Sequence, residues 1–331
     1  STKFKLTWKT FLLPALGLVA FLLYLYIFRV DIPTIIATVQ RIDLSIYSLA
    51  VASLILDTFF FALSWRFLLN FLFVKLSVVK SFLYVWYGIF MDIIIPAESV
   101  SGEISRVYLV TREQNGTSGK VVASVVVQRL MFMGINITSL LLGLSILLTQ
   151  RQVSEIVLNL TLFLAIATTI FLALLILLCV KEMWTMRVID AVIRFLEYVS
   201  RGRWKLTKIR ADVIKAARMF HDSMKEFRHA PKTIFASLFF SVLAWLLSLG
   251  VAYLVLLSMG LTIHWSVIIV TYSILLAVKA IPIGVPFEVG LPEITMTTLY
   301  TVLGIPLEIS ATATILTRIL TVWLRSVSYT H

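Results

Sequence analysis

The sequence is poor in charged residues and has almost no cysteine. Cys179 is the single cysteine among 331 residues, so no intrachain disulfide can form and a disulfide-stabilised secreted domain is excluded. Charged residues make up only 14% of the chain, whereas soluble globular proteins carry about 25%. A soluble globular protein is excluded as well, because a folded chain of this size must expose polar surface to water.

Motifs for phosphate, metal and acyl chemistry are also missing. The sequence has no Gly-rich P-loop, no His-Glu-x-x-His, no Cys-x-x-Cys and no Gly-x-Ser-x-Gly. Its four histidines are scattered, and its aspartates do not form the clusters that bind magnesium diphosphates. We therefore expect no metal site and no cofactor, and we do not expect ATP-driven transport by this chain.

Long apolar runs dominate what is present. Hydrophobic residues make up 60% of the chain and the mean hydropathy is +0.99. A helix that crosses a bilayer needs about 20 mostly apolar residues, and six runs qualify: 11–28, 44–65, 121–148, 157–180, 234–258 and 311–327. Two further segments, 82–109 and 266–303, are interrupted by proline, glycine and acidic residues. The sequence predicts an all-α integral membrane protein with a single membrane domain over residues 1–331.

The distribution of basic residues predicts the topology. The net charge is +12, and the segment 181–232 alone has 13 basic and 6 acidic residues. Basic loops face the cytoplasm and its anionic lipid, so this charge requires no nucleic acid as a partner. With 181–232 inside, both termini are predicted to be cytoplasmic at the cell membrane. The segments 82–109 and 266–303 then become two re-entrant hairpins, inserted from opposite sides, beside six full transmembrane helices.

The segment 181–232 has apolar residues at helical spacing, with lysine and arginine between them. One interpretation is a pair of basic amphipathic helices on the cytoplasmic membrane surface. The other interpretation is a helical hairpin that packs on itself between the two halves of the protein.

The two interrupted segments share a pattern. Each has a proline, a glutamate two positions later, then a glycine and a second glutamate: Pro96, Glu98, Gly102 and Glu103, and Pro286, Glu288, Gly290 and Glu293. Each precedes an apolar run with one arginine in its body, Arg129 or Arg318. A first unit, 44–148, is therefore predicted to recur as a second unit, 234–327, in inverted orientation. Such paired broken segments are typical of the binding sites of transporters, where irregular backbone lines a polar cavity.

Several motifs spread along the chain match one family: Gly102-Glu103-Ile-Ser-Arg106, Gln128-Arg129-Leu, Ile281-Pro282, Gly290-Leu-Pro-Glu293, Leu303-Gly304 and Leu316-Thr-Arg318. The sequence resembles the lysylphosphatidylglycerol synthetase transmembrane-region family, also called the flippase-like domain family. The resemblance implies a polytopic protein that moves lipids between leaflets, in some members aminoacylated phosphatidylglycerol. The chain departs from the family pattern in two places: Gln128 stands where glutamate is common, and Phe287-Glu288 where two glycines are common.

We select ten ionisable residues within the predicted membrane segments, where each charge costs at least about 2.5 kcal/mol on insertion scales. We expect Arg106, Arg129 and Arg318 to bind a lipid phosphate, because guanidinium offers a fork of donors that matches it. Lys279 either contacts the anionic head group or pairs with a glutamate across the bend. The acids are expected to line a polar groove or to carry protons: Asp57, Asp92, Glu98, Glu103, Glu288 and Glu293.

Structural roles are open for several of these residues. Glu103 and Arg106 are three positions apart and can pair on one helix face. Arg129 and Arg318 can extend to the membrane surface instead of facing a site. Asp57 can be a neutral hydrogen-bonding acid, because burial favours the protonated form of a carboxyl group.

These observations favour a non-enzymatic lipid translocase for an anionic or head-group-modified phospholipid, a glycolipid or a polyprenyl-phosphate lipid. One alternative is a membrane-embedded enzyme that uses the same carboxylates as acid and base on a lipid-linked phosphate. Another is a non-catalytic membrane partner that recruits a soluble synthetase or glycosyltransferase through the basic segment 181–232. A homodimer is compatible with all three.

Overall fold

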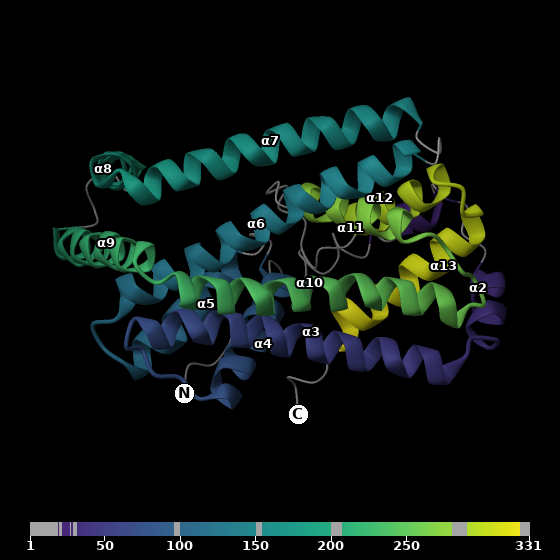
Figure 1. The fold of residues 1–331 in the computed structure, drawn as a ribbon, viewed down its shortest axis with the longest axis horizontal. Helices are drawn as coiled ribbons and strands as arrows, with labels where there is room; N and C mark the ends of the chain where they lie inside the picture. Colours follow the sequence, from purple (N-terminus) through teal and green to yellow (C-terminus); the bar gives the residue numbers. More distant parts are fainter. Residues whose placement is uncertain are drawn as a thin grey trace.

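The computed structural model is built from helices (Figure 1). It describes residues 19, 22–26, 28, 32–95, 100–149, 154–199, 207–279 and 290–324, and no strand occurs among them. The elements in chain order are α2 (Ile32–Val39), α3 (Leu44–Phe71), α4 (Val78–Ile94), α5 (Val100–Glu113), α6 (Ser118–Thr149), α7 (Glu155–Val180), α8 (Glu182–Val199), α9 (Thr207–Arg228), α10 (Pro231–Ser258), α11 (Trp265–Lys279), α12 (Leu291–Val302), α13 (Leu307–Arg318) and the π-helix η2 (Ile319–Leu324). The prediction of an all-α protein is confirmed for these residues.

Four described helices, α3, α6, α7 and α10, are long and apolar enough to cross a membrane. They contain the predicted runs 44–65, 121–148, 157–180 and 234–258. The predicted run 311–327 begins in α13 and continues into η2, and the predicted run 11–28 lies largely outside the described residues. A multi-pass membrane protein is therefore confirmed.

α3 and α10 form an antiparallel pair through the middle of the molecule (Figure 1). At one end, the amide of Asp43, the N-cap of α3, donates to the carbonyl of Ser258 at 2.8 Å. Toward the other end, the Ser64 hydroxyl lies 2.8 Å from the hydroxyls of both Ser237 and Ser241. Small polar residues allow two helices to approach closely and to bond in apolar surroundings. The first and second predicted units meet along this pair.

Each helix of the central pair carries a shorter helical hairpin. α4 and α5 pack on α3 in a cluster that includes Trp65 and Val85, and α11 and α12 pack on α10 in a cluster that includes Leu256 and Tyr300. The hairpins lie toward opposite ends of the central pair (Figure 1). Residues 96–99 and 280–289, which connect the two helices of each hairpin, lie outside the described part of the chain.

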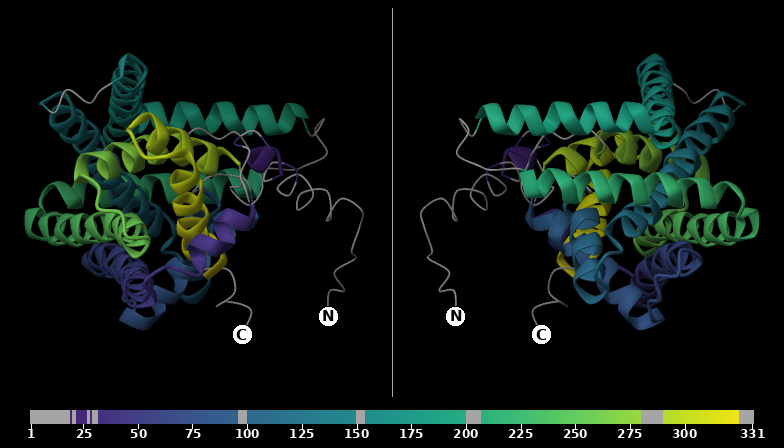
Figure 2. Two further views of the ribbon diagram at one scale, coloured as in Figure 1. Left: turned by 90° about the vertical axis from the view of Figure 1, so that its right-hand side faces the viewer. Right: turned by 90° about the vertical axis from the view of Figure 1, so that its left-hand side faces the viewer.

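The basic segment 181–232 contains α8 and α9, at one end of the long helices. Figure 1 views both helices nearly end-on and Figure 2 shows them lengthwise, so they run across the direction of the long helices. In α9, Phe227 is buried in a cluster with Leu68 of α3. In α8, Trp184, Val192 and Phe195 are 48%, 51% and 64% exposed. α9 thus packs on the bundle, whereas the exposed apolar face of α8 is typical of a membrane-surface helix.

Candidate functional site

A cavity of about 640 Å³ is bordered by the helices of both predicted units and by α7. Its charged lining residues come from both units: Asp57, Asp92, Glu103, Arg106, Arg129 and Arg318. Six of the ten ionisable residues selected from the sequence therefore border one space. Charge at membrane depth is tolerated where it faces protein or a wet cavity, so this clustering relieves its cost.

In the first unit, an ion pair joins α5 to α6. Arg129 Nη1 lies 2.8 Å from Glu103 Oε2, and the two side chains are 26% and 20% exposed. Glu103 lies in the first turn of α5, where a carboxylate also interacts favourably with the positive end of the helix dipole. Glu103 thus pairs with the next helix rather than with Arg106 three residues along its own helix.

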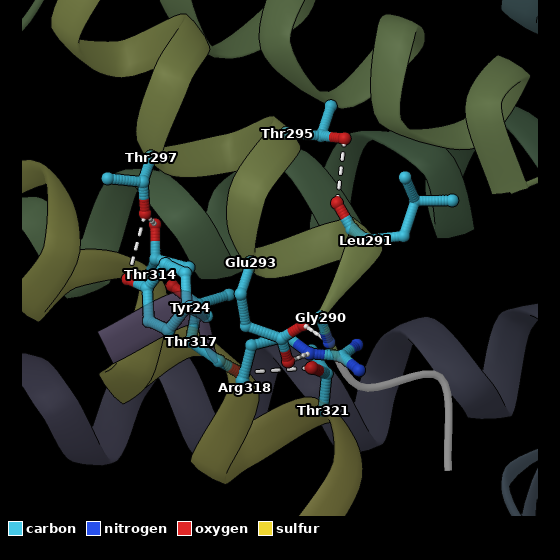
Figure 3. A network of polar contacts seen from close by, with 10 residues as sticks. All are labelled: Tyr24, Gly290, Leu291, Glu293, Thr295, Thr297, Thr314, Thr317, Arg318 and Thr321. Atoms are coloured by element: carbon cyan, nitrogen blue, oxygen red, sulfur yellow. Dashed lines mark hydrogen bonds and ion pairs between the residues drawn. The ribbon is translucent and has the colours of Figure 1, made fainter. Parts of the chain in front are cut away.

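In the second unit, an ion pair joins α12 to the end of α13 (Figure 3). Arg318 Nε donates to Glu293 Oε1 at 2.6 Å, and the two side chains are only 10% and 4% exposed. The other carboxylate oxygen of Glu293 accepts a hydrogen bond from the Gly290 amide at 2.7 Å, which caps α12. Gly290 has φ of 103°, a conformation that favours glycine. Arg318 is the last residue before η2, and π-helical segments are frequent at functional sites.

The two ion pairs occupy matching positions in the predicted repeat. Each glutamate lies in the first turn of the second helix of its hairpin, and each arginine lies on the helix that follows. The partners are 26 residues apart in the first unit and 25 in the second. The sequence pattern shared by the two units thus coincides with a shared tertiary contact.

Arg106 is the third arginine of the cavity and is held by neutral groups. The residue is 6% exposed, and its Nη1 donates to Gln128 Oε1 at 3.1 Å. Its guanidinium carbon lies 5.3 Å from the ring centroid of Phe61 and 5.1 Å from that of Trp65. Ring faces attract a cation but do not neutralise it. Among the described residues no carboxylate lies within ion-pair distance of Arg106, although those of Glu103 and Asp92 interact with it electrostatically.

Asp92 and Asp57 add two carboxyl groups to the cavity wall. Asp92 Oδ1 accepts hydrogen bonds from the Ser101 hydroxyl at 2.7 Å and from the Gly102 amide at 2.6 Å. These contacts fix the end of α4 against the start of α5. Asp57 is half-buried near the middle of α3.

Uncharged polar residues of the cavity were not predicted from the sequence. Asn136 Oδ1 and Trp245 Nε1 are buried, border the cavity and have no hydrogen-bond partner within the described part of the chain. Buried polar atoms are normally satisfied, so these two point to water or a ligand in the cavity. Gln128 donates to the Phe61 carbonyl at 2.8 Å and thereby orients the amide that holds Arg106. In the sequence, Gln128 belongs to the Gln128-Arg129-Leu motif, whereas the only signal for Asn136 is that it interrupts the apolar run of α6.

A chain of hydroxyl groups lies beside the second ion pair (Figure 3). The Tyr24 hydroxyl is 2.9 Å from the Thr297 hydroxyl, which donates to Thr314 at 3.1 Å. Tyr24 belongs to the predicted run 11–28, so this contact places the described part of that run against α12 and α13.

Three predicted site residues have no described side chain. Glu98 and Glu288 lie in the segments outside the described residues, and Lys279 is located only by its backbone at the last position of α11. Their roles stay predictions. Within the described ranges, no group of three or more histidine, cysteine, aspartate or glutamate side chains is arranged to hold a metal ion.

α7 forms an apolar wall of the cavity. The lining residues of this helix are Phe163, Leu164, Ala167, Thr168 and Phe171. Their spacing places them on one helix face. The cavity therefore has a charged wall from the two units and a largely apolar wall from α7.

Comparison with known proteins adds two matches. A family model described as "Lysylphosphatidylglycerol synthase TM region" matches residues 13–328. A Pyrococcus horikoshii protein described as a UPF0104 membrane protein is 22% identical over 320 residues, which cover 96% of this chain and 94% of that protein. No solved structure matches the chain.

Proposed function

Since the chain belongs to the lysylphosphatidylglycerol synthase TM region family, we propose that it moves a lipid between the two leaflets of the membrane. The proposed substrate is a phospholipid, glycolipid or polyprenyl-phosphate lipid with an anionic or modified head group, and it leaves chemically unchanged. The supporting observation is the cavity of about 640 Å³, which combines arginines from both units with an apolar wall. A lipid requires both, because its head group binds to charged residues and its acyl chains lie against apolar ones.

The proposed topology has six transmembrane helices, two re-entrant hairpins and both termini in the cytoplasm. Two features support it: α3 and α10 are antiparallel, and the hairpins α4–α5 and α11–α12 lie toward opposite ends of that pair (Figure 1). Both hairpins border the cavity in the part of the chain that the structure describes, the first through Asp92 and Gly102 and the second through Ala277, and exposed backbone groups are tolerated at such a cavity.

Arg106 is the proposed first contact for the lipid phosphate, because no carboxylate lies within ion-pair distance of it among the described residues. Arg129 and Arg318 join it when phosphate oxygens replace Glu103 and Glu293 as their acceptors. Charge-assisted bonds from guanidinium to phosphate are strong and directional. After the lipid leaves, each glutamate takes back its arginine, so that no unpaired charge is left at membrane depth.

Reconstituted vesicles test this function. Short-chain fluorescent phosphatidylglycerol is placed in both leaflets, and dithionite bleaches only the outer one unless the protein moves lipid outward. R129A and R318A are each expected to slow this movement at least about tenfold, because each loses a charge-assisted bond to the phosphate. R210A is the matched control, since Arg210 lies on α9 and is 53% exposed, and we expect it to keep the original rate.

Mass spectrometry of the recovered lipid distinguishes transport from catalysis. An unchanged lipid mass is expected, and a new product would favour the enzyme that uses the cavity carboxylates. Full lipid movement in both R129A and R318A would refute the role assigned to the cavity arginines.

A further inference from the structure

A second hollow lies at the surface, in the turn between α3 and α4. It measures about 460 Å³ and is lined by Arg66, Asn70, Lys75, Leu76 and Ser77. It lies at the end of the bundle that carries α9, where Phe71 stacks on Phe227 with ring centroids 5.4 Å apart. None of its lining residues borders the large cavity.

Two positive charges in this hollow have no counter-charge among the described residues. Arg66 Nε donates to the Leu76 carbonyl at 2.8 Å, and its remaining guanidinium N–H groups have no partner among the described residues. The Lys75 ammonium is exposed and also has no partner there. The next basic residue, Lys80, is instead paired with Glu113 at 3.0 Å. The hollow therefore presents two cationic side chains to an anion.

The backbone of the turn is fixed from several directions. Gln114 Nε2 donates to the Lys75 carbonyl at 2.7 Å, and Lys120 Nζ donates to the Leu72 carbonyl at 3.1 Å. Together with the bond from Arg66, these contacts hold the turn before any ligand arrives. A site that is ordered in advance loses less conformational entropy on binding.

Phe73 is an independent sign that this turn meets lipid. Its φ is 62°, the only positive φ of a non-glycine residue in the described ranges. Phe73 is also 80% exposed. A bulky residue in this conformation is strained, and such strain is typical of functional positions. Packing does not compensate the strain, because the ring projects from the protein. An exposed aromatic ring at the end of a membrane bundle is suited to the boundary between head groups and acyl chains.

We propose that this turn binds the phosphate of an anionic phospholipid from the adjacent leaflet. Arg66 and Lys75 contact the head group, the start of α4 at Ser77 adds the positive end of a helix dipole, and Phe73 enters the acyl boundary. A free phosphate ion would use the two cations but would gain nothing from Phe73, and for this reason the lipid is the favoured ligand. The site holds lipid at the surface and is separate from the cavity of the proposed transport path.

Native mass spectrometry of the full chain with phosphatidylglycerol tests the site. R66Q/K75Q is expected to lose one tightly bound lipid, with its affinity reduced by roughly thirtyfold, the effect of two surface cations at about 1 kcal/mol each. K215Q/K225Q removes two exposed charges from α9 and is expected to bind as the original protein does. R129A/R318A is expected to keep this lipid as well, which separates the site from the cavity. Unchanged binding in R66Q/K75Q would overturn the proposal.

Phe73→Asn provides a second variant that does not depend on the charges. Asparagine tolerates positive φ, so F73N is expected to keep or raise the melting temperature while phosphatidylglycerol binding weakens severalfold. A lower melting temperature with unchanged lipid binding would make Phe73 a purely structural residue and contradict the proposal.

A large excess of inorganic phosphate is expected to leave the lipid bound. Complete displacement by phosphate, with F73N binding normally, would identify a soluble anion as the ligand instead.

Discussion

Glu293 and Arg318 are 4% and 10% exposed, whereas Glu103 and Arg129 are 20% and 26% exposed, although Arg318 borders the cavity as Arg129 does. A charge that loses its partner in a sealed environment costs about 3–5 kcal/mol. A charge that keeps contact with water costs far less, and exposed pairs contribute about 0–1 kcal/mol. The two matching ion pairs therefore differ in what they contribute to stability.

Glu293→Gln is expected to lower the free energy of unfolding by about 3 kcal/mol, because the buried guanidinium of Arg318 loses its ion pair with Glu293. Glu103→Gln is the matched variant and is expected to cost less than E293Q, because Arg129 is more exposed than Arg318. Thermal unfolding of the purified protein in detergent measures both. Equal losses would mean that the two pairs are equally solvated, contrary to the observed burial.

The sequence identifies the charged residues of the cavity but not their partners. Charge within an apolar run is costly and therefore informative, and on this basis Arg129 and Arg318 were selected. The choice of Arg129 over Arg106 as the partner of Glu103 depends on how α5 packs against α6, which helix spacing alone does not reveal. Asn136 was missed because a neutral amide in a long apolar helix carries little cost and so little signal.

The sequence predicts that a helix exists more readily than it predicts the residues at which the helix begins and ends. The runs that became α3, α6, α7 and α10 are long and apolar throughout, so length alone identifies them. The breaks at proline and glycine mark the two helical hairpins. The change from α13 to η2 at Arg318 carries no local signal, because neighbouring helices decide where a π-helical turn is tolerated. Packing likewise decides that α9 is buried against the bundle whereas α8 exposes its apolar face, since both helices have amphipathic patterns.

The contact between α4 and α5 depends on Gly102. A Cβ at this position would lie 2.5 Å from the Gly88 carbonyl oxygen and closer still to Asp92 Oδ2, and real Cβ atoms do not approach other atoms so closely. G102A is therefore expected to destabilise the protein by about 1–3 kcal/mol and to displace the carboxylate of Asp92. G134A is the control in α6, where a Cβ meets nothing within 4 Å, and the better helix propensity of alanine is expected to leave stability equal or up to about 1 kcal/mol higher. Similar melting temperatures for the two variants would rule out the close packing of this hairpin.

The molecule as a whole places a polar path and an apolar wall around one cavity. The charged residues come from two units of the chain that are far apart in sequence, and the apolar wall comes from α7, which links them. A phosphate alone would require only the charged side. The proposed lipid substrate also requires that the α7 side stay open to acyl chains.

Ala167→Trp tests this requirement, because Ala167 borders the cavity from α7. The larger ring fills the space proposed for acyl chains, so lipid movement in vesicles is expected to slow by about tenfold or more. Stability is expected to change little, because Ala167 is an exposed position. Ile166→Trp is the matched control: the neighbouring residue is 61% exposed and does not border the cavity, so its replacement is expected to leave the rate unchanged. Equal rates for both variants and the original protein would exclude α7 as a wall of the lipid path, and equal slowing in both would point to a general effect of bulk on this helix.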